Sequence, residues 1–150
     1  MSLVRRVSSI FEKLQELEWL PILIVRLAEG YMFATSGWGK LGKLHEFTAY
    51  FESLGIPLAS LQAPFVATLE LVGGAALVVG FGTRIFSALL AGTMAVAILT
   101  ARLQEASVKT AGDFFYLQEW LLLLLLVWLV FSGPGKVSVD AKLKRRSQER

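Results

Sequence analysis

Four long apolar segments dominate the sequence and restrict what the chain can fold into. They cover residues 20–38, 62–81, 84–101 and 114–132. Each is close to the roughly 20 residues that an α-helix needs to cross a bilayer. The fourth contains WLLLLLLVWLVF, residues 120–131, which carries no charge. With 55% hydrophobic residues in a chain of 150, these segments predict an all-α, polytopic membrane protein in which four transmembrane helices form a bundle.

The chain on either side of these segments is polar and charged. In residues 1–18 the apolar positions recur with helical spacing, and they are Leu3, Val4, Val7, Ile10, Phe11, Leu14 and Leu17. This pattern predicts an amphipathic helix at the membrane interface, ahead of the first span. Residues 19–135 would then form the membrane domain. Residues 136–150 form a basic tail that we expect to be loosely ordered.

The longest predicted connection follows the first span and carries a helix signal of its own. Phe47, Tyr50, Phe51 and Leu54 have helical spacing, and Gly55 and Pro57 follow them directly. Glycine commonly ends a helix and proline prevents its continuation. The connection is therefore predicted to hold a short amphipathic helix. The fourth span is predicted to end in the same way, at the glycine and proline of SGPG.

The composition excludes several kinds of chemistry. The chain has no cysteine, so a thiol–disulfide relay within it is excluded. Its one histidine, with no cysteine beside it, does not suffice for a haem, zinc or iron–sulfur site. Any redox chemistry would need an organic cofactor or a partner subunit. The net charge of +3 resides mainly at the chain ends, which argues against nucleic acid as a partner.

The distribution of lysine and arginine predicts the orientation in the membrane. Four spans place both termini on one side, and that side carries ten of these residues if Arg84 is included, against four on the other. Positive charge marks the cytoplasmic side of a membrane protein. We therefore expect a multi-pass protein of the cell inner (plasma) membrane with both termini in the cytoplasm.

Charged residues inside the predicted spans are the candidate site. They are Arg26, Glu29, Glu70 and Glu119, with Arg84 at a span boundary. A charge at the centre of a membrane helix costs about 3 kcal/mol, so such a residue is expected to have a partner and a function. Helix depths predict one polar cluster near mid-membrane in which Arg26 meets Glu29 or Glu70. Since three carboxylates face one cation, at least one should hold a proton. Such a cluster suits a quinone-like head group or a proton path, and it could equally cross-link the bundle without a ligand.

The order and spacing of five stretches resemble the DoxX family of membrane proteins over nearly the whole chain. The stretches are RLAEGYMFATSGWGKL, FTAYFESLGIP, LELVGGAALVVGFGTR, a methionine-bearing third span and GPGKVSVD. The resemblance implies a four-helix membrane bundle and an association with redox systems, including quinone or catechol stress responses and a soluble oxidoreductase or sulfurtransferase partner. The family's recurrent positions correspond to Arg26, Glu70 and Gly82–Arg84 here.

Three functions remain open from the sequence. The leading hypothesis is an accessory subunit of a redox system that binds a quinone-like molecule or docks a soluble redox partner through the Arg/Glu cluster. In it, Arg26 orients an oxygen of the ligand and Glu70 holds or passes a proton. The second hypothesis is a small proton-coupled transporter. The third is an assembly or scaffold protein without a ligand. Small residues along the third span also allow a homo-oligomer, since close helix contact in lipid depends on them.

Overall fold

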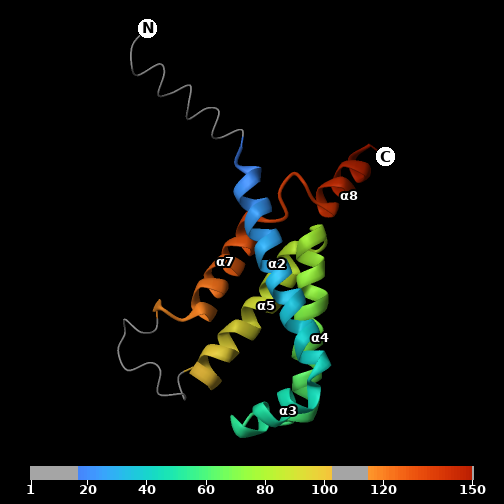
Figure 1. Ribbon diagram of the computed structural model, residues 1–150. Helices are drawn as coiled ribbons and strands as arrows, with labels where there is room; N and C mark the ends of the chain where they lie inside the picture. Colours follow the sequence, from blue (N-terminus) through green and yellow to red (C-terminus); the bar gives the residue numbers. More distant parts are fainter. Residues whose placement is uncertain (1–16, 103–114, 150) are drawn as a thin grey trace.

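The fold is known from a computed structural model that describes residues 17–102 and 115–149. The regular elements in these two ranges are helices. In chain order they are α2 (Trp19–Gly42), α3 (Leu44–Ser53), α4 (Ala59–Val79), α5 (Thr83–Ala97), the π-helical turn η1 (Ile98–Arg102), α7 (Gln118–Ser132) and α8 (Val139–Gln148). Helices α2, α4, α5 and α7 lie side by side, with α3 at one end of the bundle and α8 at the other (Figure 1).

The antiparallel pair α2 and α4 makes the most extensive contact in the bundle, and glycine allows the two backbones to approach closely. A Cβ atom at Gly37 of α2 would overlap backbone atoms of Ala67 and Leu71 in α4. One at Gly74 of α4 would overlap backbone atoms of Gly30 and Ala34 in α2. Close contact through small residues is the usual way in which membrane helices gain packing energy. These contacts determine which α4 residues face a given turn of α2.

The buried core lies where all four long helices meet. It is a cluster of six residues, Phe33 from α2, Leu77 from α4, Leu90, Ala91 and Met94 from α5, and Leu126 from α7. Leu77, Leu90 and Leu126 are fully buried. Since α2 and α5 are both antiparallel to α4, they run in the same direction. This cluster is the reference level for the depths of the charged residues below.

The outward face of the helices is apolar. Large side chains that are more than half exposed occur on each long helix, and they include Ile24, Trp38, Phe65, Ile85, Leu99 and Phe131. Exposed apolar surface of this extent is typical of contact with lipid. In the described part of the chain, Ala59–Val79 and Thr83–Ala101 are long and apolar enough to cross a membrane. Helix α2 is long enough, but Arg26 and Glu29 make it less apolar. Helix α7 is apolar, but its 15 residues are too few. The four-span bundle therefore stays a prediction.

Several helix ends lie where the sequence predicted them. The short helix α3 ends at Ser53, and Gly55 follows with a φ of +71°. Helix α7 ends at Ser132, and Gly133 follows with a φ of +79°. Both glycines occupy the left-handed region that other residues rarely adopt.

The prediction of a loosely ordered tail is wrong. Residues Val139–Gln148 form helix α8, because the hydroxyl of Ser138 caps it by accepting a hydrogen bond of 3.1 Å from the backbone N–H of Ala141. The amphipathic helix predicted for residues 1–18 falls almost wholly outside the described residues.

Candidate functional site

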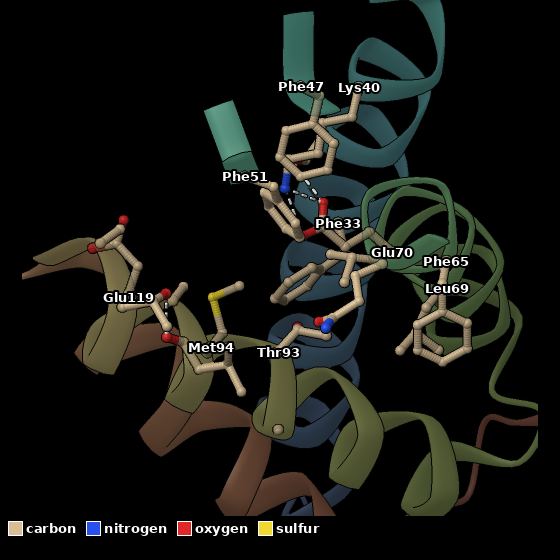
Figure 2. A pocket seen from close by; sticks show the side chains of 18 of the residues that line it. Phe33, Lys40, Phe47, Phe51, Phe65, Leu69, Glu70, Thr93, Met94 and Glu119 are labelled. Carbon is tan, nitrogen blue, oxygen red and sulfur yellow. Dashed lines mark hydrogen bonds and ion pairs between the residues drawn. The ribbon is translucent and has the colours of Figure 1, made fainter. Parts of the chain in front are cut away.

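A cavity of about 560 Å³ opens between the helices at the end of the bundle where α3 lies. Its walls come from α2, α3, α4, α5, η1 and α7. Most of the lining is apolar, with five aromatic side chains, Phe33, Phe47, Tyr50, Phe51 and Phe65. Figure 2 shows Phe33, Phe47 and Phe51 close to Lys40 and Glu70. The cavity is therefore an aromatic chamber with an ion pair in its wall.

The ion pair joins Lys40, in the last turn of α2, to Glu70, in the middle of α4. The Nζ atom of Lys40 lies 2.6 Å from Oε1 and 2.5 Å from Oε2 of Glu70. The hydroxyl of Ser36, one turn before Lys40, donates a third hydrogen bond of 3.0 Å to Oε2. The Glu70 side chain is 2% exposed and that of Lys40 is 29% exposed. Lys40 thus balances the charge of the buried Glu70, and the Lys40 side chain also lines the cavity.

The close contact between α2 and α4 sets this arrangement. Gly37 rests against Ala67 and Leu71, so the turn of α2 that holds Ser36 and Lys40 faces the turn of α4 that holds Glu70. The ammonium group of Lys40 also lies 5.0 Å from the centre of the Phe47 ring. The face of an aromatic ring attracts a cation at this distance. One lysine therefore links α2, α3 and α4 at the edge of the cavity.

Glu119 is the second predicted site residue that lines this cavity. It belongs to the first turn of α7. Figure 2 shows it across the cavity from Glu70, with Met94 between the two. The cavity therefore brings together two of the predicted carboxylates, although they do not share a cation there.

The prediction that Arg26 would meet Glu70 is wrong. Arg26 lies near the opposite end of the bundle and its side chain is directed toward the chain that follows α7. Its Nη1 donates to the carbonyl oxygen of Pro134, and its Nη2 donates to that of Val137 at 2.7 Å. Among the described residues the ion pairs are Lys40–Glu70 and Lys43–Glu46, so Arg26 does not pair with Glu29 either. The two residues lie at different levels of the bundle, because Glu70 faces the turn of α2 that holds Ser36 and Lys40, several turns after Arg26.

The segment held by Arg26 also covers the start of α5. The carboxylate of Asp140 accepts hydrogen bonds from the backbone N–H groups of Gly82 at 2.9 Å and Thr83 at 3.1 Å. Its own N–H donates to the carbonyl of Gly80 at 3.0 Å. An acidic side chain at a helix N-terminus stabilises it through the free N–H groups and the helix dipole. Residues Gly133–Asp140 thus form a strap across this end of the bundle, which we call the C-terminal strap.

The two remaining predicted residues lie on the strap side of the core. Arg84 is attached to the end of α7, where its Nη2 donates to the carbonyl oxygen of Phe131 at 3.3 Å. Glu29 is 2% exposed, and its Oε2 has no hydrogen-bond partner. The structure therefore divides the predicted single cluster in two. Glu70 and Glu119 line the cavity, whereas Arg26, Glu29 and Arg84 lie toward the other end.

Sequence reasoning missed Lys40, which takes the place predicted for Arg26. Lys40 closely follows the first apolar segment and is one of the four basic residues assigned to the non-cytoplasmic side. The available signal was its position four residues after Ser36 at the end of a membrane helix, since a lysine there can extend its stem along apolar surface. The aromatic wall supplied by Phe47, Tyr50 and Phe51 was visible as a helix face, but not as part of a cavity.

Comparison with known proteins agrees with the residues that suggested a family. The DoxX family matches residues 21–103, which is more than half of the chain. "Inner membrane protein YqjF" of Escherichia coli (strain K12) is 28% identical over 134 residues, covering 89% of this chain and 99% of that protein.

Two further relatives are similar to the chain. "Putative oxidoreductase CatD" of Bacillus subtilis (strain 168) is 32% identical over 118 residues, covering 79% of this chain and 83% of that protein. "Uncharacterized membrane protein Rv3486" of Mycobacterium tuberculosis is 28% identical over 138 residues, covering 84% of this chain and 83% of that protein. No solved structure matches. The family match, the coverage of these relatives and the helical bundle with its apolar outer face together establish that this chain is a membrane protein of the DoxX family.

Proposed function

We propose that the protein is an accessory membrane subunit of a redox system that binds a quinone-like small molecule in the aromatic cavity. The observation that carries this proposal is the Lys40–Glu70 ion pair in the wall of an otherwise mostly apolar chamber of about 560 Å³. Chambers of roughly 300–1,000 Å³ with few polar groups are typical of small-molecule sites. The ligand that fits is a flat, mostly apolar ring with oxygen at its edge.

The ion pair can bind both redox forms of such a ring. The ammonium group of Lys40 would donate a hydrogen bond to a carbonyl or phenolate oxygen. The carboxylate of Glu70 would accept one from the hydroxyl of a reduced, phenolic form. The rings of Phe33, Phe47 and Phe51 line the same space and offer offset or edge contacts to an aromatic ligand. Lys40 therefore takes the role that the sequence assigned to Arg26, and Glu70 keeps its own.

The redox assignment has separate support. One relative carries the name "Putative oxidoreductase CatD", and the chain itself has no cysteine for thiol chemistry. Electrons would then pass between the bound ring and a soluble oxidoreductase or sulfurtransferase partner. Under this proposal the chain holds and orients the ring, and the partner supplies the chemistry.

Ligand binding tests the proposal directly. The protein purified from its own membranes should carry a quinone that mass spectrometry of the lipid extract identifies. The purified protein should also bind menadione in a calorimetric titration in detergent. The double variant Lys40→Met/Glu70→Gln removes both charges at once and should bind at least about tenfold more weakly, because one charge-assisted hydrogen bond contributes about 1.5–3 kcal/mol.

Arg84→Gln is the matched control, because it removes a charge that lies outside the cavity and should leave menadione binding unchanged. Equal binding by the double variant and the unaltered protein would refute the site. Absence of any bound quinone, combined with proton-coupled flux of a solute into liposomes, would identify the protein as a transporter. Absence of both would identify it as a scaffold.

We also propose that the bundle crosses the inner membrane four times with both termini in the cytoplasm. Helix α8 lies at one end of the bundle and α3 at the other (Figure 1). Helix α8 carries basic residues, and the cavity lies at the α3 end. A relative is named an inner membrane protein. An impermeant maleimide should label a cysteine at Ser53 in intact cells and spare one at Ser147. Labelling at Ser147 would reverse the orientation.

A further inference from the structure

A second group of polar side chains is buried between the aromatic cavity and the C-terminal strap. Glu29 on α2 is 2% exposed, and Thr83 and Ser87 on α5 are fully buried. The Oε2 atom of Glu29 and the hydroxyl oxygens of Thr83 and Ser87 each have no hydrogen-bond partner in the described part of the chain. Buried polar groups are nearly always hydrogen-bonded, so several unpartnered atoms in one region point to a function.

Contacts at the strap end establish the depth of this group. The guanidinium of Arg26 lies against Gly80, and the strap residue Asp140 bonds both to Gly80 and to the N–H of Thr83. Arg26 on α2 and Thr83 on α5 therefore lie at the same end of the bundle. Glu29 lies about one turn inward from Arg26, and Ser87 one turn inward from Thr83.

The core establishes the depth from the other side. Phe33, one turn beyond Glu29, and Leu90, about one turn beyond Ser87, belong to the same buried cluster. Because α2 and α5 run in the same direction, Glu29 and Ser87 lie at one level, between the core and the strap. Both are buried, so both face the interior of the bundle. We call Glu29, Thr83 and Ser87 the buried polar layer.

Within the described residues, the charges around this layer leave Glu29 without a counterion. Arg26, on the same helix, donates to two strap carbonyls and forms no ion pair with Glu29. Arg84 of α5 donates to Phe131 at the end of α7. On α4, Glu70 is occupied by Lys40. On α7, Glu119 lies in the first turn, at the cavity end.

A carboxylate that is buried in a bundle without a cation or a donor is costly in its ionised form and is relieved by binding a proton. The neutral acid can then share a bridging water with the unpartnered hydroxyl groups of the layer. We propose that Glu29, Thr83 and Ser87 form a proton-binding site, separate from the ligand cavity, whose proton exchanges with water from the strap side. Such a site one turn beneath the cavity-lining Phe33 allows proton uptake to be coupled to ligand binding. The site itself does not depend on what the cavity binds.

Infrared difference spectroscopy of the full-length protein in lipid nanodiscs tests this site at neutral pH. The carbonyl stretch of a protonated carboxylic acid should be present in the unaltered protein, lost in Glu29→Gln and retained in Glu70→Gln, the matched control. It should shift in ²H₂O, because the proton is exchangeable. If the spectra of the unaltered protein and Glu29→Gln coincide in this region, Glu29 is ionised and the proposal fails. If sodium chloride removes the band and choline chloride does not, the site binds a metal cation rather than a proton, and the proposal fails as well.

A second measurement needs no variant and therefore covers the case in which Glu29→Gln does not fold. Dicyclohexylcarbodiimide is lipophilic and adds to a protonated carboxylic acid, first forming an O-acylisourea that rearranges to a stable N-acylurea. Peptide mapping of the treated, unaltered protein should place the adduct at Glu29 and leave Glu70 unmodified. An adduct at Glu70 with Glu29 unmodified would overturn the assignment.

Discussion

Replacing Lys40 by methionine should lower the free energy of unfolding by about 3 kcal/mol, the lower end of the cost of breaking a buried ion pair. The physical reason lies in the partner that remains. Glu70 is 2% exposed and would keep a hydrogen bond from Ser36 but lose its cation. Lys40 is 29% exposed, so solvent already weakens the pair, and for this reason the lower end applies. Unfolding followed in mixed detergent micelles measures the difference.

A double variant tests whether the loss of stability comes from the Lys40–Glu70 pair itself. Lys40→Met/Glu70→Gln removes both charges, so no buried charge is left uncompensated. It should be more stable than the sum of the two single variants by roughly 1–3 kcal/mol, the range for residues in direct contact. Additive single effects would show that the pair contributes no coupling energy.

Lys43→Met is the matched control for Lys40→Met. Lys43 lies three residues further along the chain and pairs with Glu46 at 3.6 Å. Both of those side chains are more than 70% exposed, at 73% and 72%. A solvated pair of this kind contributes little to stability, so Lys43→Met should unfold like the unaltered protein. A loss similar to that of Lys40→Met would point to general surface charge and away from the buried pair.

The contrast between Lys40 and Arg26 shows how far the sequence could predict this site. The cost of a charge in lipid identifies Arg26, Glu29 and Glu70 as buried groups, and all three are at most 2% exposed. Their partners depend on how each helix is rotated and on which turns face each other. The contacts of Gly37 and Gly74 determine this, and they join residues that lie more than 25 positions apart in the chain. Depth counted along each helix gives the level of a residue in the bundle, but not which side chains it faces.

Helix ends were easier to predict from the sequence than contacts between helices, because a helix end depends on a few neighbouring residues. Gly55 and Gly133 end helices as predicted, because the positive φ that ends a helix is a property of one residue. Helix α8 was missed although its signal was also local: Ser138 is a good N-cap residue, and Asp140 follows in the first turn. The high charge of the tail favours disorder, whereas the cap favours a helix, and the cap prevails.

Replacing Arg26 by methionine should release the C-terminal strap. The guanidinium makes hydrogen bonds to the carbonyl oxygens of Pro134 and Val137, and each charge-assisted bond contributes about 1.5–3 kcal/mol. Asp140 would keep its hydrogen bonds from the N–H groups of Gly82 and Thr83. We expect trypsin to cleave the basic helix α8 at least about tenfold faster, and the free energy of unfolding to fall by about 3 kcal/mol. Arg26→Lys should give an intermediate result, because an ammonium group lacks the fork that spans two acceptors.

Two comparisons separate the strap from the partner that the sequence predicted for Arg26. Arg84→Met removes another arginine at this end, which makes a single bond of 3.3 Å to Phe131, and it should leave the cleavage rate of α8 almost unchanged. If Arg26 were paired with Glu29, then Arg26→Met and Glu29→Gln would compensate each other. The structure has no ion pair between them, so their effects on stability should compensate by less than about 0.5 kcal/mol, the lower end for residues in direct contact. Compensation between these two variants, or a cleavage rate unaffected by Arg26→Met, would mean that Arg26 acts on a carboxylate inside the bundle and not on the strap.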